Sequence, residues 1–112
     1  MQIETRLEGD VQVIKLTGEL MAGHDSEKLR NVVDESINAE NVNIVVDMEK
    51  VTWMNSSGLG MLISALTSLR SSGGDMRLAN MSDRIRRPMQ ITKLDKVFQD
   101  FDSVDDAVKS FA

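Results

Sequence analysis

The amino-acid sequence predicts an α/β fold, in which a mostly parallel sheet begins with an antiparallel hairpin and carries about four helices. The first observation is that two alternating segments, 2–8 and 11–17, are separated only by Gly9-Asp10, a typical two-residue hairpin turn. The second is that helical and strand-like segments alternate through the rest of the chain, as in sheets built from right-handed crossovers. The third is that 112 residues without a repeat or a linker suit one domain, residues 1–112, around one core.

The first helix is expected to run from Asp25 or Ser26 to about Asn38, after a connection at residues 18–23. Asp and Ser are both suitable N-cap residues. An apolar stripe at helical spacing supports this helix, and its members are Leu29, Val32, Val33 and Ile37. A strand is expected next, at residues 42–47, because an apolar run there ends in an aspartate.

The second helix is expected from about Ser57 to Ser71. Its apolar stripe, again at helical spacing, consists of Leu59, Leu62, Ile63, Leu66 and Leu69. Gly73-Gly74 is a common way to end a helix, because glycine readily adopts the left-handed conformation that follows the last turn. A short strand should then occupy residues 76–79.

The last third of the chain is expected to hold a helix at 82–92, a short strand at 97–98 and a closing helix at 103–111. Pro88 lies inside the first of these helices and should kink or shorten it, because proline has no N–H to donate. Ser103 is a suitable N-cap for the closing helix.

The composition argues against several classes of function. The chain has 41% hydrophobic and 28% charged residues, as globular domains do, and its net charge of −5 argues against nucleic acid as the main partner. With no cysteine and one histidine, we expect no metal site. No apolar run approaches the roughly 20 residues that span a bilayer, and the first residues show no signal-peptide pattern. We therefore expect a cytoplasmic protein without membrane insertion.

Three catalytic or cofactor motifs are incomplete. A triad of Ser56 or Ser57 with His24 lacks the Gly-x-Ser-x-Gly elbow, because no glycine stands two residues before Ser56. The glycines of residues 18–23 have the spacing of a phosphate-binding P-loop, but no Lys-Ser or Lys-Thr follows them. The glycines of residues 58–60 lack the third glycine of the dinucleotide fingerprint. We expect neither catalytic residues nor a cofactor, and a serine hydrolase remains only a minor alternative.

Residues 54–60, Met-Asn-Ser-Ser-Gly-Leu-Gly, lie where the second helix begins. Hydroxyl groups and backbone N–H groups face solvent together at such a position, so we predict a regulatory site. The helix face opposite the apolar stripe has small side chains, one methionine and no charge, which suits close approach by another protein. The predicted partner-binding residues are Asn55, Ser56, Ser57, Gly58, Met61, Ser64, Thr67 and Ser68.

Residues 45–60 closely resemble the core signature of STAS domains and, more narrowly, of the bacterial anti-sigma-factor antagonists. Residues 16–20, 85–87 and 94–98 extend the resemblance to most of the chain. The resemblance implies a small α/β domain in which Ser56 is the regulatory serine. It also implies that an anti-sigma factor with serine kinase activity phosphorylates Ser56, and that the unphosphorylated form binds this factor and frees the sigma factor. A phosphatase would reset the cycle.

Two positions depart from the family pattern. Asn55 stands where the family usually has aspartate, and Met21 stands where aspartate is also frequent. Asparagine and aspartate are nearly equivalent as helix caps, so the local fold should be unchanged. The missing carboxylate leaves a second interpretation open: a STAS subunit that regulates an ATP-binding-cassette lipid-transport complex by binding it, with the serine loop serving as structure.

Overall fold

The computed structural model describes residues 1–21, 23–91, 93 and 96–112. In this part of the chain the strands are β1 (Gln2–Glu8), β2 (Val11–Leu20), β3 (Asn43–Met54), β4 (Asp75–Ala79) and β5 (Gln99–Phe101). The helices are α1 (His24–Asn38), α2 (Ser56–Ser71), α3 (Asp83–Ile91) and α4 (Val104–Lys109). None of these helices combines the length and the apolar character needed to cross a membrane.

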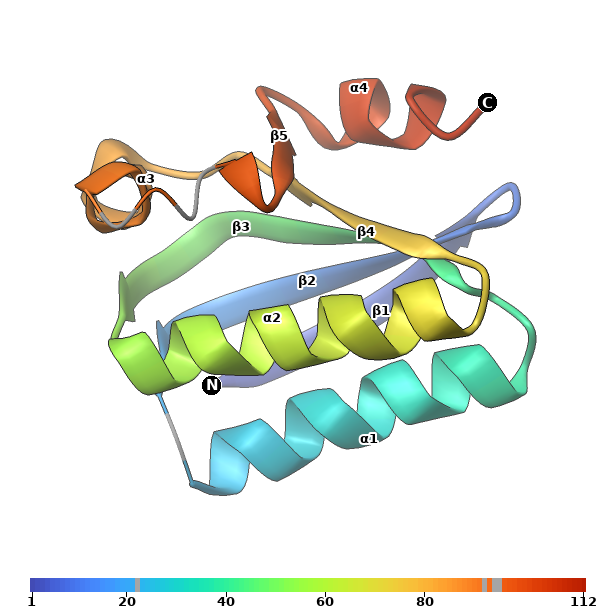
Figure 1. Ribbon diagram of the computed structural model, residues 1–112, viewed down its shortest axis with the longest axis horizontal. Helices are drawn as coiled ribbons and strands as arrows, with labels where there is room; N and C mark the ends of the chain where they lie inside the picture. Colours follow the sequence, from blue (N-terminus) through green and yellow to red (C-terminus); the bar gives the residue numbers. More distant parts are fainter. Residues whose placement is uncertain (22, 92, 94–95) are drawn as a thin grey trace.

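The strands form one sheet in the order β1-β2-β3-β4-β5, with β1 antiparallel to β2 and the other pairs parallel. The predicted α/β fold with an N-terminal antiparallel hairpin is therefore confirmed. Because right-handed crossovers advance in one direction along this order, α1 and α2 lie side by side on the same face of the sheet (Figure 1). The short helix α4 lies on the opposite face, and α3 lies beside the end of β3.

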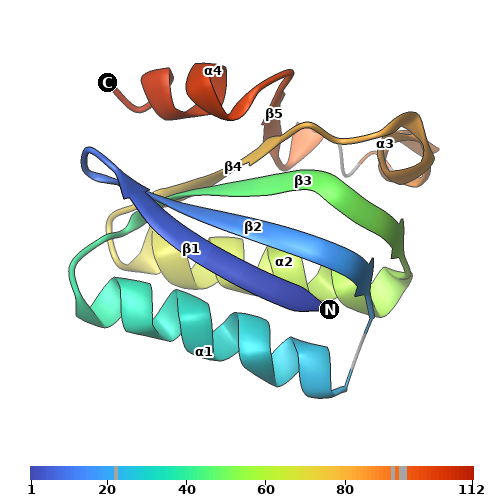
Figure 2. The same ribbon diagram turned by 180° about the vertical axis from the view of Figure 1, so that it is seen from behind.

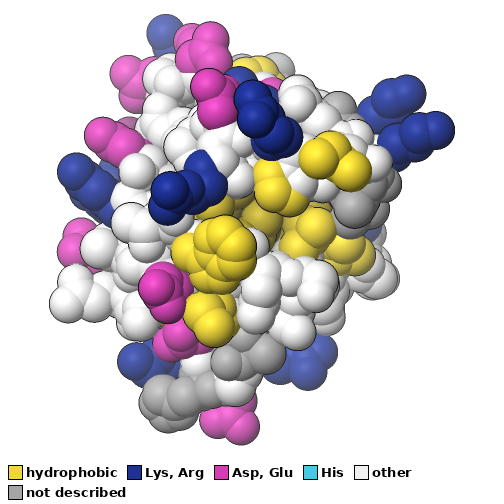
Figure 3. Space-filling model, turned by 90° about the vertical axis from the view of Figure 1, so that its left-hand side faces the viewer, with side chains coloured by type: hydrophobic (Ala, Val, Ile, Leu, Met, Phe, Trp, Pro, Cys, Tyr) yellow, Lys and Arg dark blue, Asp and Glu magenta, His cyan; other side chains and the backbone are white. Residues whose placement is uncertain are grey.

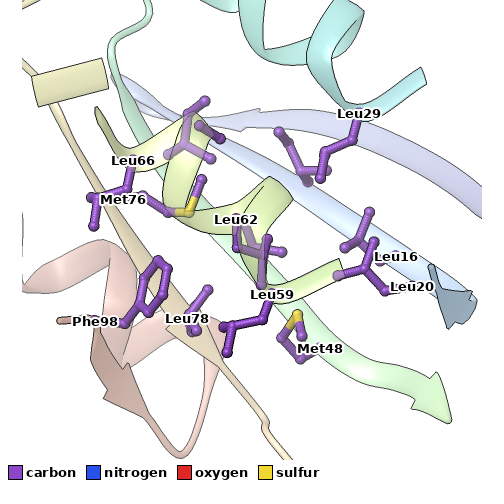
Figure 4. Close-up of a cluster of buried hydrophobic side chains, with 14 of the residues drawn as sticks. Leu16, Leu20, Leu29, Met48, Leu59, Leu62, Leu66, Met76, Leu78 and Phe98 are labelled. Atoms are coloured by element: carbon purple, nitrogen blue, oxygen red, sulfur yellow. The ribbon is translucent and has the colours of Figure 1, made fainter. Parts of the chain in front are cut away.

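The main core fills the space between the sheet and the pair α1 and α2. Figure 4 shows leucines from α2 pointing toward side chains of the strands. Methionines complete this core, since Met48, Met76 and Met89 are all 0–1% exposed and their flexible side chains fill irregular gaps. The labelled members in the close-up are Leu16, Leu20, Leu29, Met48, Leu59, Leu62, Leu66, Met76, Leu78 and Phe98.

A smaller core lies on the other face of the sheet, under α4. Its buried members are Val11, Val13, Val45, Ala79 and Ala107. Helix α4 begins after Ser103, whose hydroxyl accepts a hydrogen bond from the N–H of Asp106 at 3.1 Å, so the predicted N-cap is confirmed. The guanidinium of Arg77 stacks over the ring of Phe111 at 3.8 Å and so anchors the segment after this helix.

Two strands are longer than the sequence indicated. β2 continues to Leu20 instead of ending at Thr17, and β3 continues to Met54 instead of ending at Asp47. The extensions pair with each other across register shifts, so that Leu20 lies opposite Met54. These irregularities interrupt the simple alternation of apolar residues, which is why the pattern alone predicted strands that were too short.

Other boundaries also differ from the prediction. Gly23, with φ of 101°, is the N-cap of α1 and has no side-chain cap; Asp25 lies within the first turn, so the predicted cap at Asp25 or Ser26 is wrong. The last strand begins at residue 99 and not at 97, because its pairing with β4 starts at Gln99, opposite Arg77. Phe98, just before the strand, is buried in the core. α3 keeps Pro88 inside it and ends in the described region at Ile91, and the predicted last residue, 92, lies outside the described residues.

Candidate functional site at the start of helix α2

The predicted regulatory motif lies at the edge of the sheet where β2 and β3 both end. Leu20 and Met54, the last residues of these parallel strands, are paired, and α2 begins two residues after Met54. Gly58, in the first turn of α2, is buried, and a Cβ added to it would overlap the carbonyl oxygen of Leu20. The first turn of α2 thus lies directly against the end of β2.

Asn55 holds the start of α2 in place. Its backbone is extended, with φ of −96° and ψ of 179°, and its side-chain Oδ1 accepts a hydrogen bond from the N–H of Gly58 at 2.8 Å. Its backbone carbonyl accepts the first helical hydrogen bond, from the N–H of Leu59 at 3.0 Å. This is the geometry of an N-cap, and it makes Ser56 the first residue of the helix, one position earlier than predicted.

Two substitutions of Asn55 test whether its side chain acts as a helix cap and whether the family's aspartate would serve equally well. We expect Asn55→Ala to lower the free energy of unfolding by about 1 kcal/mol, because the N–H of Gly58 loses its acceptor. Asn55→Asp should leave stability nearly unchanged, since either side chain presents an oxygen at the same place. Urea unfolding of the three proteins tests this, and equal losses in both variants would contradict a capping role.

Ser56 and Ser57 are both exposed. The N–H groups of the first helical turn have no acceptor within the helix, and the Asn55 side chain occupies only that of Gly58. The first turn of α2 contains no acidic residue, so the positive end of the helix dipole is not neutralised there. The site can therefore accept an anion, including a phosphate attached to a serine, without leaving a buried charge unpaired.

The predicted partner-binding face of α2 borders a hollow of about 380 Å³ between α1 and α2. The residues of α2 that line it are Ser57, Gly60, Met61, Ser64, Ala65 and Ser68. Helix α1 lines the other side with Leu29, Val33, Arg30 and Asp34. The sequence of α2 alone suggested an uncharged surface. The surface around this face does carry charge, because α1 contributes one cation and one anion.

Four predicted partner-binding residues do not line this hollow, namely Asn55, Ser56, Gly58 and Thr67. The hydroxyl of Thr67 is exposed and donates a hydrogen bond to the carbonyl of Ile63 at 3.0 Å. Gly58 is buried against β2, which gives it a packing role. Any contact of these four residues with a partner stays a prediction.

Sequence reasoning missed Trp53, which lies at the end of β3 beside the motif and is 48% exposed. Figure 3 views the side of the molecule where β3 ends, and shows hydrophobic side chains gathered there between basic and acidic ones. A single tryptophan next to the serine motif was the available signal, but it falls beyond the strand predicted at 42–47. An exposed tryptophan at such a place is a typical anchor for protein binding.

Within the part of the chain that the structure describes, no group of three or more His, Asp or Glu side chains is placed to hold a metal ion. His24 is the first residue of α1, two elements before the serine motif in the chain. The described residues at the start of α2 offer two exposed hydroxyl groups beside the capping side chain of Asn55.

Comparison with known proteins identifies the family. The family model of the STAS domain matches residues 2–107. The anti-sigma F factor antagonist of Paenibacillus polymyxa is 28% identical over 104 residues, covering 92% of this chain and 88% of its own. The anti-sigma-B factor antagonist of Staphylococcus aureus is 30% identical over 94 residues, covering 84% of this chain and 86% of its own.

A solved structure has the same fold: the Bacillus cell fate determinant SpoIIAA in the phosphorylated form superposes with a TM-score of 0.76 at 24% identity, covering 99% of this chain and 100% of that one. The capped helix start at the edge of a mixed sheet, the match to the family model and the named relatives all agree. The chain therefore belongs to the STAS domain family, in the group of the anti-sigma factor antagonists.

Proposed function

We propose that this chain binds an anti-sigma factor and that phosphorylation of Ser56 switches this binding off. The observation that carries the proposal is the position of Ser56, which is exposed and is the first residue of a helix capped by Asn55. Relatives named as anti-sigma factor antagonists support the class of partner. A protein of the same fold has been solved in a phosphorylated form, which supports phosphorylation as the modification.

The docking surface in this proposal combines the start and outer face of α2 with Trp53 at the end of β3. Trp53 would supply the buried anchor, and the small side chains of Ser57, Ser64 and Ser68 would let the partner approach closely. Met61 adapts to an uneven surface. The protein acts in the cytoplasm by binding, without catalysis of its own.

The switch is electrostatic. A phosphate on Ser56 adds about −1.5 to −2 charges at neutral pH. The N–H groups and the dipole of α2 tolerate this anion, so the modified domain stays folded. The same anion must lose its water when a partner docks, and it repels acidic or phosphate groups opposite it. Binding is lost while the fold is kept, and a phosphatase restores the binding form.

Variants of Ser56 test the switch. With an anti-sigma factor that has serine kinase activity, Ser56→Ala should bind as the wild type does but take up no phosphate. Ser56→Asp should weaken binding about tenfold or more, because it places a permanent charge in the interface. Titration calorimetry measures the binding, and mass spectrometry locates the phosphate.

Ser57→Ala is the matched control, because Ser57 is also exposed and is the next residue on the same turn. It should still be phosphorylated at Ser56 and lose binding on phosphorylation. Phosphate found on Ser57 alone, or undiminished binding of Ser56→Asp together with undiminished binding of the phosphorylated wild type, would refute the proposed switch.

A further inference from the structure

The outer edge of β1 is an open surface of the sheet. β1 is the first strand in the sheet order, and in the described part of the chain it pairs with β2 alone. Six of its seven residues are exposed, and Leu7 is 56% exposed, which is unusual for a large apolar side chain. Figure 2 shows β1 running along the margin of the sheet, with the N-terminus at its end. An edge strand of this kind presents backbone N–H and C=O groups that another strand can pair with.

We propose that this edge binds the same edge of a second copy of the chain, with the two β1 strands antiparallel and centred on Thr5. In this register Ile3 lies opposite Leu7 of the second copy, and Glu4 lies opposite Arg6. The two residues of each pair are an even number of positions apart in the sequence. Their side chains therefore lie on the same face of the sheet, and their N–H and C=O groups point toward the same edge of β1. The two five-stranded sheets would become one continuous sheet.

The charges of β1 select this register. Centred on Thr5, every Glu4 meets an Arg6 and every Glu8 meets the uncharged Gln2. Centred on Glu4, the strands would place Glu4 against Glu4, and centred on Arg6 they would place Arg6 against Arg6. Opposite charges directly across a strand pair stabilise it, and like charges destabilise it. The strand is self-complementary in one register and repulsive in the two beside it.

A hollow beside β1 offers space for the apolar pair of Ile3 with Leu7 of the second copy. About 590 Å³ of space lies between β1 and α1, lined by Ile3, Val32 and the side chains of Lys28 and Asn31 among others. Ile3 pairs with the buried Leu16 and therefore faces the helices. Leu7, four residues further along β1, projects on the same face. In the dimer, Leu7 of the second copy lies opposite Ile3 and so enters the hollow of the first copy.

In the isolated chain Arg6 already has a partner, but that contact is weak enough to be exchanged for Glu4 of the second copy. Its guanidinium contacts Glu8 at 3.0 Å, but both side chains are nearly half exposed, at 49% and 45%. Such a surface pair contributes little to stability, so Arg6 can bind Glu4 of the second copy instead. A single seven-residue strand makes a small interface, so the dimer should be weak and form only at high protein concentration.

Charge reversal tests the register. Sedimentation velocity from micromolar to millimolar concentration should show the wild type shifting from monomer toward dimer. Glu4→Arg and Arg6→Glu should each weaken the dimer about tenfold, because each replaces two attractive pairs with two repulsive ones. The double variant carrying both changes should restore dimerisation to near the wild-type level, since the pairs are attractive again with their signs exchanged.

Glu49→Arg on β3 is the matched control; it reverses one exposed charge two strands away and should leave the dimer unchanged. Thermal unfolding verifies that the variants fold. Hydrogen exchange of the β1 amides in the wild type, slower at high concentration, gives a second measure that needs no variant. A wild type that stays monomeric throughout, or a double variant that does not recover, overturns the proposal. None of these measurements uses an anti-sigma factor, so their failure leaves the Ser56 switch untouched.

Discussion

Gly58→Ala is expected to lower the free energy of unfolding by about 3 kcal/mol, because α2 has no room for a side chain where its first turn meets β2. The added Cβ would overlap the carbonyl oxygen of Leu20 and lie 2.9 Å from its carbonyl carbon. These are backbone atoms held in the sheet by pairing with Met54, so they cannot rotate away as a flexible side chain would. The start of α2 must shift instead, and the hydrogen bond from Gly58 to the Asn55 side chain is strained.

Gly60→Ala is the control for this prediction. A Cβ at Gly60 meets nothing within 4 Å, although Gly60 lies on the same helix only two residues away. We expect a gain in stability of up to about 1 kcal/mol, because alanine has the higher helix propensity. Urea unfolding, followed by the fluorescence of Trp53, measures both variants. If Gly58→Ala were as stable as Gly60→Ala, close packing against β2 could not be what requires glycine in this motif.

Asp47→Ala is expected to cost about 3 kcal/mol, because Asp47 joins two parts of the domain from a buried position. The carboxylate is 5% exposed, and its Oδ1 accepts hydrogen bonds from the N–H of Glu49 and from Nδ2 of Asn80, each at 3.1 Å. Asn80 has a left-handed backbone, with φ of 60°, and its N–H bonds to the carbonyl of Phe101 at 3.0 Å. Without Asp47, two donors in this region lose their acceptor.

Two further variants test whether the hydrogen bonds of the Asp47 side chain account for this loss of stability. Asp47→Asn should lose less stability than Asp47→Ala, since its amide oxygen can still accept both hydrogen bonds. Glu49→Ala should change stability little, because the Glu49 side chain is exposed and only its backbone N–H takes part. Thermal unfolding ranks the three. If Asp47→Ala lost no more stability than Glu49→Ala, the two hydrogen bonds would not stabilise the domain.

The candidate site was largely predictable because its signals are local. Asn55 precedes an apolar stripe at helical spacing, and that is enough to predict a capped helix start with Ser56 exposed beside it. Trp53 was missed because exposure depends on where β3 ends, and β3 ends seven residues later than its apolar run. The hollow beside α2 was missed because four of its ten lining residues come from α1.

The sequence by itself determined the hairpin, the alternation of helices and strands, and the serine at the start of α2. Each of these features depends on residues that are close together in the sequence. The tertiary structure alone decided the full length of β2 and β3, because their last residues are held by pairing with each other across register shifts. It also decided that Asp47 lies inside a strand and not at its end, because β3 goes on pairing with β2 from Lys50 to Met54. The partner of the buried carboxylate, Asn80, lies 33 residues away in the sequence. Burial and pairing between distant segments are properties of the folded chain, and no local pattern contains them.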